Sequence, residues 1–288
     1  MKMDKRYVCL LYLTALFIGI SAKSRHRITG ETLLSVKPSL KLEPRIVNGE
    51  DAIAHSYPWQ AALVSEEEEE GDQEKIMFCG GSLIDKHYVL TAAHCVAGVT
   101  KDEATVILGD HLLNEEEGVE QVRHVSKIIR SPVYKNCTMD KDYALLKLDK
   151  PAILNEYVNV IPLGKEFVSS GDCIVTGWGT EDENGSVNNI LEEATVDVLP
   201  QDICQYVWSN VIDILPSMLC AGTGISGSCS GDSGGPLICR DNGEWFLAGI
   251  TSWGAECGLM GVPDVYTRVS AIYDEIKAVI DGKNNNNV

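Results

Sequence analysis

Short hydrophobic runs separated by turn-forming residues make up most of this 288-residue chain. The runs are three to six residues long, and many contain Val, Ile, Leu and Thr, which favour the extended conformation. Many short strands at such spacing are typical of β-barrels and β-sandwiches. The pattern therefore predicts an all-β protein, with strands at residues 61–64, 81–84, 88–90, 105–108 and 143–148 in the first half and at residues 173–176, 194–198, 236–239 and 247–250 in the second.

One stretch near the C-terminus has the spacing of an amphipathic helix. Ile272, Ile276, Val279 and Ile280 fall on one helical face, and Gly282 follows them as a stop signal. We therefore expect a C-terminal helix at residues 270–281, followed by a frayed polar tail.

The first 22 residues have the organisation of a secretory signal peptide. Three basic residues come first, an apolar run follows at residues 7–20, and small residues stand at positions 21 and 22. The run is too short to span a bilayer, and no later stretch is long enough. We expect a secreted, extracellular protein without a membrane segment. Residues 23–45 are basic and contain two prolines, which is typical of a linker or propeptide.

Ten cysteines are consistent with an oxidising compartment. Cys9 lies in the signal peptide, so nine remain after its removal, and one of these must be unpaired or bonded to another molecule. The net charge is −18, and the acidic excess lies after residue 45. Such a surface favours solubility and repels nucleic acid, so we expect no nucleic-acid partner.

Two stretches concentrate the acidic residues. Residues 65–72 should repel one another and form a solvated loop, with the attraction of cationic partners as the alternative interpretation. Residues 109–120 are dense in hard oxygen ligands. They predict either a charged surface loop or a calcium loop, because calcium takes about six to eight oxygen ligands from carboxylates, carbonyls and water.

Three residues that lie far apart in the sequence are candidates for nucleophilic catalysis. Ser233 lies in the glycine-rich segment 228–236, His94 follows the strand predicted at 88–90, and Asp142 precedes the apolar run 143–148. Taken singly, each would more often be a turn or structural residue. Together they supply a nucleophile, a base and a carboxylate that orients the base.

Six motifs containing these residues resemble the chymotrypsin/trypsin family of serine endopeptidases, in order and in spacing. The resemblance extends from Ile46 to about Ile280. It implies two antiparallel six-stranded Greek-key β-barrels, at about 46–155 and 156–270, plus the C-terminal helix, within one protease domain at residues 46–288. The motifs are residues 46–49, 91–95, 142–148, 177–179, 231–236 and 252–254.

The resemblance also implies a role for each site residue. Ser233 would attack the scissile carbonyl, His94 would take its proton, Asp142 would fix the histidine tautomer, and the amides of Gly231 and Ser233 would hold the oxyanion. No cofactor is required. The expected partners are protein or peptide substrates, an activating trypsin-like protease and protein inhibitors, and we expect a monomer.

A second set of roles concerns activation and substrate binding. Cleavage after Arg45 would free the Ile46 ammonium, which Asp232 would receive in a buried ion pair. The precursor should therefore be nearly inactive. Ser252, Trp253 and Gly254 resemble the short strand that pairs with the substrate backbone.

The resemblance pairs eight cysteines and leaves Cys137 over, for which a free thiol is one interpretation. Asn136 and Asn184 are glycosylation acceptors by motif. The family's calcium loop would place carboxylates at Asp110, Glu117 and Glu120 and carbonyls at Leu112 and Glu115, although Asp110 is shorter than the usual glutamate. The implied disulfides are Cys79–Cys95, Cys173–Cys239, Cys204–Cys220 and Cys229–Cys257.

The predicted primary pocket departs from the trypsin pattern. Its base carries Gly227, where trypsin-like members have aspartate, and its wall carries Asp264. This pair resembles crustacean collagenolytic (brachyurin-type) proteases and implies a broad preference for basic and large apolar residues. If Asp264 pairs elsewhere, the pocket would be chymotrypsin-like.

The leading hypothesis is a secreted serine endopeptidase made as a zymogen. The alternatives are a catalytically silent homologue that acts as a binding or cascade cofactor, and a selective cascade protease. Silent homologues lose a triad residue, and here all three are present.

Overall fold

The computed structural model describes residues 49–282, except 70–71, 167, 169–170, 181–185, 224–225, 256 and 258. The predicted signal peptide and propeptide, Arg45, Ile46 and Asn184 lie outside the described residues. Within the described part of the chain, no helix is both long enough and apolar enough to cross a membrane.

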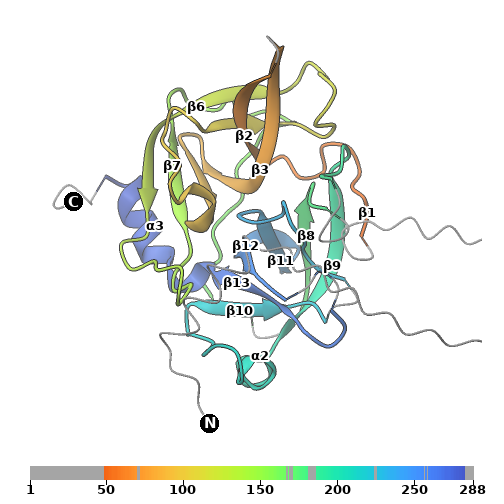
Figure 1. Cartoon of the computed structure of the whole chain (residues 1–288), viewed down its shortest axis with the longest axis vertical. Coiled ribbons are helices and arrows are strands. Elements are labelled where there is room, and N and C mark those ends of the chain that lie inside the picture. The colour runs from red at the N-terminus through yellow and green to blue at the C-terminus, as the bar shows by residue number, and fades with distance from the viewer. Residues whose placement is uncertain are drawn as a thin grey trace, which may run out of the picture. The chain divides into compact units, whose positions relative to one another are not determined.

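Six strands of the first half close into a barrel (Figure 1). Neighbouring strands are antiparallel, and hydrophobic side chains such as those of Leu63, Leu90 and Leu145 are fully buried. The order around the barrel is β2 (Gln60–Glu69), β3 (Asp72–Asp85), β4 (Tyr88–Thr91), β7 (Ala144–Leu148), β6 (Gln121–Arg130) and β5 (Thr105–Leu108), which pairs again with β2.

A second antiparallel barrel follows in the sequence, so the prediction of two six-stranded barrels is confirmed. The short strand β1 (Glu50–Asp51) is added to its outside by pairing with β9, so the first described strand of the N-terminal half belongs to the second sheet. The order is β9 (Glu192–Leu199), β10 (Met218–Ala221), β13 (Asp264–Arg268), β12 (Glu244–Trp253), β11 (Pro236–Asp241) and β8 (Asp172–Gly177), which pairs again with β9.

Among the described residues, two α-helices and two short 3-10 helices lie outside the strands. The predicted C-terminal helix forms as α3 (Tyr273–Ile280), preceded by η3 (Val269–Ala271), and its Ile276 packs into the same core cluster as the first barrel. The other elements are η2 (His94–Val96) and α2 (Gln201–Trp208), and the sequence did not predict α2.

The prediction of a loop at residues 65–72 is wrong for the backbone. Strands β2 and β3 continue as a hairpin, with Glu66 opposite Lys75 and Glu69 opposite Asp72. The ladder that starts in the barrel between residues 60–63 and 79–82 extends outward along both strands. Backbone pairing therefore outweighs the local repulsion that the charge pattern predicted.

The structure contains the four disulfides that the resemblance implied. They join Cys79 to Cys95, Cys173 to Cys239, Cys204 to Cys220 and Cys229 to Cys257. Cys137 is also disulfide-bonded. The interpretation of Cys137 as a free thiol is therefore wrong for this structure.

Candidate active site

His94 and Asp142 are joined by two hydrogen bonds. Asp142 is fully buried, and its Oδ2 lies 2.7 Å from Nδ1 of His94, while its Oδ1 accepts the His94 backbone N–H at 2.9 Å. A carboxylate oxygen can only accept, so Nδ1 must carry the proton and Nε2 is left with a lone pair. These contacts fix the orientation of the His94 ring, as a general base would require, and the catalytic role of His94 stays a prediction.

Two residues of the second barrel hold Asp142 in place. The hydroxyl of Ser252 donates to Oδ2 at 2.6 Å, and the hydroxyl of Thr267 donates to the Asp142 carbonyl oxygen at 2.9 Å. The buried carboxylate is thus hydrogen-bonded from both barrels, which offsets the cost of removing it from water. Sequence reasoning assigned Ser252 to substrate binding and missed Thr267.

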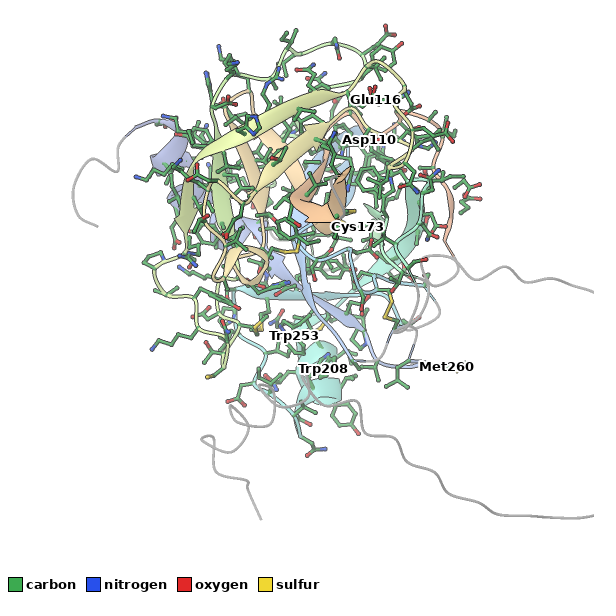
Figure 2. All side chains as sticks on the ribbon, turned by 45° about the horizontal axis from the view of Figure 1, so that its top comes forward. Asp110, Glu116, Cys173, Trp208, Trp253 and Met260 are labelled. Carbon is green, nitrogen blue, oxygen red and sulfur yellow. A yellow bond between two sulfur atoms is a disulfide. The ribbon has the colours of Figure 1, made fainter. Side chains whose placement is uncertain are left out.

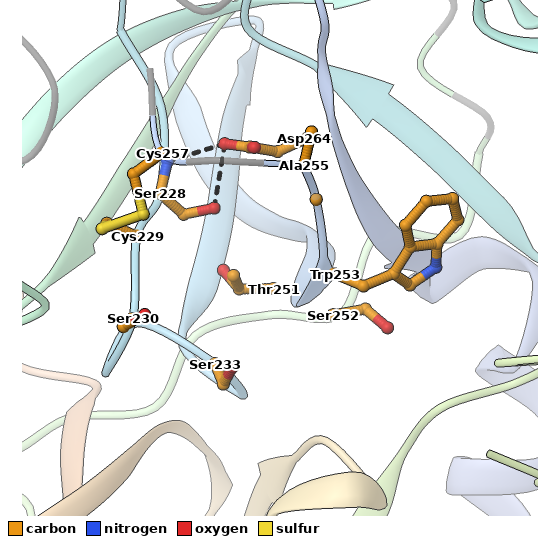
Figure 3. Close-up of a pocket in the computed structure, with 11 residues that line it drawn as sticks. Ser228, Cys229, Ser230, Ser233, Thr251, Ser252, Trp253, Ala255, Cys257 and Asp264 are labelled. Atoms are coloured by element: carbon orange, nitrogen blue, oxygen red, sulfur yellow. Dashed lines mark hydrogen bonds between the residues drawn. A yellow bond between two sulfur atoms is a disulfide. The ribbon is translucent and has the colours of Figure 1, made fainter. Parts of the chain in front are cut away.

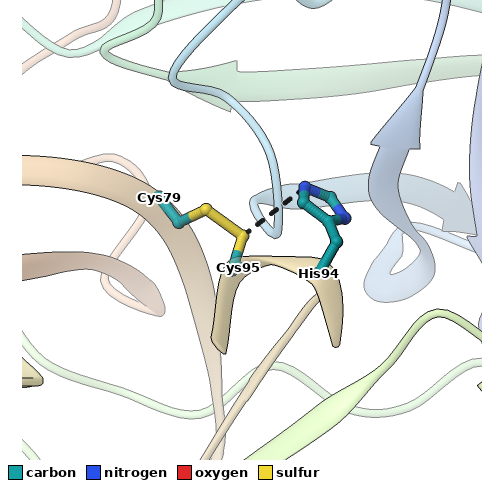
Figure 4. A group of neighbouring side chains, drawn as sticks. All are labelled: Cys79, His94 and Cys95. Carbon is teal, nitrogen blue, oxygen red and sulfur yellow. Dashed lines mark hydrogen bonds between the residues drawn. A yellow bond between two sulfur atoms is a disulfide. The ribbon is translucent and has the colours of Figure 1, made fainter. Parts of the chain in front are cut away.

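His94 and its two neighbouring cysteines, Cys79 and Cys95, cannot bind a metal ion together. Nε2 lies 3.7 Å from Sγ of Cys95, and Cys79, His94 and Cys95 form a close group (Figure 4). Both sulfurs belong to the Cys79–Cys95 disulfide, so neither can act as a thiolate ligand. The disulfide instead anchors the turn that carries His94 to strand β3.

Ser233 lies in a loop whose backbone is fixed by both barrels. Its carbonyl oxygen accepts the Gly80 N–H at 2.8 Å, and the next residue, Gly234, donates to Thr251 at 2.8 Å. Gly234 has a φ of +79°, and a Cβ there would lie 2.2 Å from Oγ1 of Thr91. Only glycine fits this position.

The amides of Gly231 and Ser233 donate no hydrogen bond within the described part of the chain. Unpaired N–H groups are uncommon in folded proteins, and two of them beside a serine are candidates for oxyanion donors. The Ser233 hydroxyl makes no hydrogen bond to Nε2 of His94 among the contacts of the described residues. The direct contact between nucleophile and base therefore stays a prediction.

Asp232 precedes Ser233 in this loop, and its side chain is completely buried. Its Oδ1 accepts the Gly179 N–H at 2.8 Å and its Oδ2 accepts the Cys229 N–H at 2.9 Å. Burial raises the pKa of Asp232 to about 7, with smaller contributions from other carboxylates, and the two amide bonds oppose the shift. None of the described residues provides a cation to this carboxylate.

A pocket of about 150 Å³ opens beside Ser233, and Asp264 lies at its opposite end (Figure 3). Oδ2 of Asp264 accepts hydrogen bonds from the backbone N–H of Ser228 at 2.7 Å and from its hydroxyl at 3.0 Å. Burial raises the pKa of Asp264 to about 6, although the Ser228 bonds lower it. The carboxylate thus belongs to the pocket and also pairs with Ser228.

Glycines on both sides make room for the Asp264 carboxylate. A Cβ on Gly227 would lie 2.5 Å from Oδ2, and a Cβ on Gly254 would lie 2.7 Å from Oδ1. The carboxylate therefore spans the pocket between these two glycines. The preference that the sequence predicted from Gly227 and Asp264 stays a prediction.

The comparisons with known proteins agree with this geometry. The family model described as Trypsin matches residues 46–276. The chain belongs to the trypsin family of serine endopeptidases. A similar protein is coagulation factor IX of Oryctolagus cuniculus, which is 40% identical over 237 residues, covering 78% of this chain and 81% of the relative. Hydrolysis of peptide bonds by this family requires no cofactor.

Beside the active site of this trypsin-family protease, two tryptophans pack edge to face. The rings of Trp208, on α2, and Trp253, at the end of β12, have centroids 4.8 Å apart at 71° (Figure 2). Trp253 lines the primary pocket together with Ser252 and Gly254. Helix α2 therefore braces one wall of the pocket, a role that sequence reasoning missed because it did not predict α2.

The acidic segment 109–120 forms a loop between β5 and β6, as expected, and gathers three carboxylates. Ligand oxygens of Asp110, Glu117 and Glu120 lie within 4.8 Å of one another. Oδ1 of Asp110 is buried and accepts no hydrogen bond. Burial, followed by the charges of Glu120 and Glu117, raises the pKa of Asp110 to about 6. A cation would satisfy that oxygen and the clustered charge, so these residues fit calcium.

Other contacts already fix part of this loop. Glu117 accepts the backbone N–H groups of His111 and Leu112 at 3.0 and 3.3 Å, and its other oxygen lies 3.4 Å from Nε2 of His55. The Leu112 carbonyl accepts the Glu115 N–H at 3.0 Å and keeps a second lone pair. Sequence reasoning missed His55, which comes from a distant turn.

Proposed function

We propose that this trypsin-family endopeptidase is an extracellular zymogen, activated by cleavage after Arg45, that cleaves after basic and large apolar residues. The observation that carries the specificity is the Asp264 carboxylate, which spans the primary pocket while bonded to Ser228. The proposed partners are protein substrates, protein inhibitors and an activating protease.

In the proposed mechanism, Ser233 attacks the scissile carbonyl and transfers its proton to Nε2 of His94. The ionised Asp142 stabilises the resulting imidazolium through the 2.7 Å contact to Nδ1. The tetrahedral oxyanion accepts hydrogen bonds from the Gly231 and Ser233 amides, each of which contributes roughly 3 kcal/mol to the barrier reduction in such sites. His94 then gives the proton to the leaving amine.

Zymogen activation is supported by the state of Asp232. A fully buried carboxylate held only by two amides is unfavourable, and its raised pKa of about 7 reflects this cost. A new Ile46 ammonium would neutralise it. We propose that this ion pair stabilises the Gly231–Ser233 loop after cleavage, so that the two oxyanion donors are held firmly in place in the activated enzyme.

The bonding of Asp264 suggests a finer preference. Oδ2 already accepts two hydrogen bonds from Ser228, so Oδ1 is the oxygen available to a substrate cation. A lysine ammonium can bind a single oxygen, whereas the planar guanidinium of arginine binds best to both. Lysine should therefore be favoured over arginine, compared with enzymes whose pocket carboxylate has two free oxygens.

Apolar residues should also be accepted by this pocket. Burial raises the pKa of Asp264 to about 6, so the carboxyl has already lost much of its water, and the two hydrogen bonds from Ser228 replace part of that solvation. An apolar side chain entering the pocket displaces little solvation from that group. This supports the broad preference that the sequence predicted.

A second candidate is a selective protease of an activation cascade. It is favoured by the likeness to a coagulation factor over 237 residues. Such an enzyme would cleave few sequences, because residues beyond the primary pocket would also have to match. The two candidates share one catalytic mechanism and differ in the breadth of the cleavage profile.

We also propose that calcium binds the loop at residues 110–120. The carboxylates of Asp110, Glu117 and Glu120 and the carbonyls of Leu112 and Glu115 would hold the ion. Its role would be structural, since it would relieve the repulsion among the acidic groups and the unsatisfied Oδ1 of Asp110.

A peptide-library profile of the enzyme cleaved after Arg45 tests these proposals together. We expect cleavage after Lys, Arg, Leu and Phe, with Lys above Arg. A profile restricted to one short motif would instead support the cascade protease. The variant Ser233→Ala is the control, and turnover by it near the wild-type rate would overturn the catalytic mechanism.

A further inference from the structure

Helix α3 contacts both residues that flank Asp142. The Lys141 ammonium pairs with Oε1 of Glu275, and the hydroxyl of Tyr143 donates to Oε2 of the same carboxylate at 2.8 Å. One side chain of the C-terminal helix therefore holds the chain on either side of the proposed catalytic acid.

The backbone at this point is bent in a way that needs support. Lys141 has a φ of +49°, a left-handed conformation that is disfavoured for a residue with a Cβ. The Tyr143 N–H donates to the Lys141 carbonyl at 2.8 Å, which closes a three-residue turn centred on Asp142. Strained backbone at a functional site persists only where surrounding contacts hold it.

Tyr143 can supply such a contact because it is held in the protein interior, where the residue is only 5% exposed. Within the described residues, Glu275 is the one hydrogen-bond partner of its hydroxyl. Burial and then Glu275 raise the pKa of Tyr143 well above its ordinary value, so the hydroxyl remains a donor at every pH at which the enzyme would act.

We propose that Glu275 is a positioning residue for catalysis, acting through Lys141 and Tyr143 on the turn that aims Asp142 at His94. The proposal depends on the proposed role of His94 and Asp142 in peptide hydrolysis. Ser252 and Thr267 hold the carboxylate and carbonyl of Asp142 from the second barrel. Glu275 supplies the constraint on the turn itself, from a helix that contributes no residue to the lining of the primary pocket.

The test compares Glu275→Gln with Asp274→Asn in the full-length enzyme after activation. Both changes remove one carboxylate charge from α3, and Asp274 is an exposed neighbour that makes none of these contacts. We expect Glu275→Gln to lower kcat about tenfold with KM changed less than about twofold, because a small misplacement of a catalytic group mainly affects the chemical step. Asp274→Asn should match the wild type.

The pH profile separates positioning from a purely structural role. If Asp142 stabilises the His94 imidazolium less well in Glu275→Gln, the acidic limb of the kcat profile should move to lower pH. A lower melting temperature with an unchanged kcat and an unmoved acidic limb would overturn the proposal. Tyr143→Phe should lower kcat in the same direction, and the double variant should lose less than the product of the two single losses.

The wild type and Ser233→Ala, assayed in parallel, distinguish the two ways of failing. A wild type without peptidase activity that depends on Ser233 would remove the proposed function itself. An active wild type with a fully active Glu275→Gln variant would remove only the role of Glu275.

Discussion

Replacing Asp264 by Asn tests the specificity argument most directly. Asparagine has nearly the same shape, can still accept the Ser228 hydrogen bonds through its amide oxygen and fits between Gly227 and Gly254. The change therefore removes the charge of the pocket without opening a cavity. Any loss confined to basic substrates is then a loss of charge recognition.

The size of the effect follows from the single free oxygen of Asp264. One hydrogen bond between a charged acceptor and a charged donor contributes about 1.5–3 kcal/mol, and about 1.4 kcal/mol corresponds to a factor of ten. We therefore expect kcat/KM after Lys to fall about 10- to 100-fold, with the upper end limited by solvent in the pocket. Cleavage after Leu should change less than about threefold, because an apolar side chain makes no bond to Oδ1.

The assay is kcat/KM for four matched peptides that differ only in Lys, Arg, Leu or Phe at the cleavage position. In the wild type, the Lys/Leu ratio should also fall as pH drops through about 6, because the raised pKa of Asp264 means that its proton returns at that pH. Any effect of pH that is common to both substrates cancels in this ratio of kcat/KM values. Asp264→Asn should show a ratio that does not depend on pH. Equal losses for all four peptides would refute the reasoning, since they would indicate a damaged pocket and not a missing charge.

Further predictions concern the triad, activation, the pocket glycines and the acidic loop. Ser233→Ala should abolish hydrolysis in a fluorogenic peptide assay and leave the melting temperature unchanged. Arg45→Gln should leave a secreted but inactive precursor after treatment with trypsin, as judged by activity and gel mobility. Gly254→Ala should reduce cleavage after Lys more than after Leu in the peptide assay, because its Cβ would meet Oδ1 of Asp264 at 2.7 Å. Saturating calcium should raise the melting temperature by about 5–10 °C, and less below pH 6 because Asp110 then becomes protonated; Glu117→Gln, followed by calorimetry, should remove most of that increase.

The strands that could be predicted from the sequence are those with a continuous hydrophobic run. Strand β6 was missed because it mixes charged and apolar residues, and its burial pattern alternates only weakly. Strand β10 has four buried residues but, unlike β5 of the same length, contains no β-branched residue that favours the extended conformation. Helix α2 has only eight residues, about two turns, which is too short for the spacing of its apolar residues to establish a helical period.

The residues of the candidate site also fall into two groups: those that the sequence identified and those that only the structure revealed. His94, Asp142 and Ser233 were identified because the motifs that contain them resemble one family in order and spacing, although each residue taken singly would more often be structural. The supporting contacts of Thr267 and Glu275 depend on where the second barrel and the C-terminal helix dock. No local pattern marks a threonine or a glutamate for that role, so only the tertiary structure reveals them.

The hydrogen bond from Ser252 to Asp142 crosses from one barrel to the other. His94 and Asp142 belong to the first barrel, and Ser233 belongs to the second. The three proposed catalytic residues therefore stay close together only while the two barrels remain aligned with each other. A slight slip between them would separate the serine from its base before any strand melts. In mild denaturant, hydrolysis should therefore cease while the circular dichroism of both halves is still native.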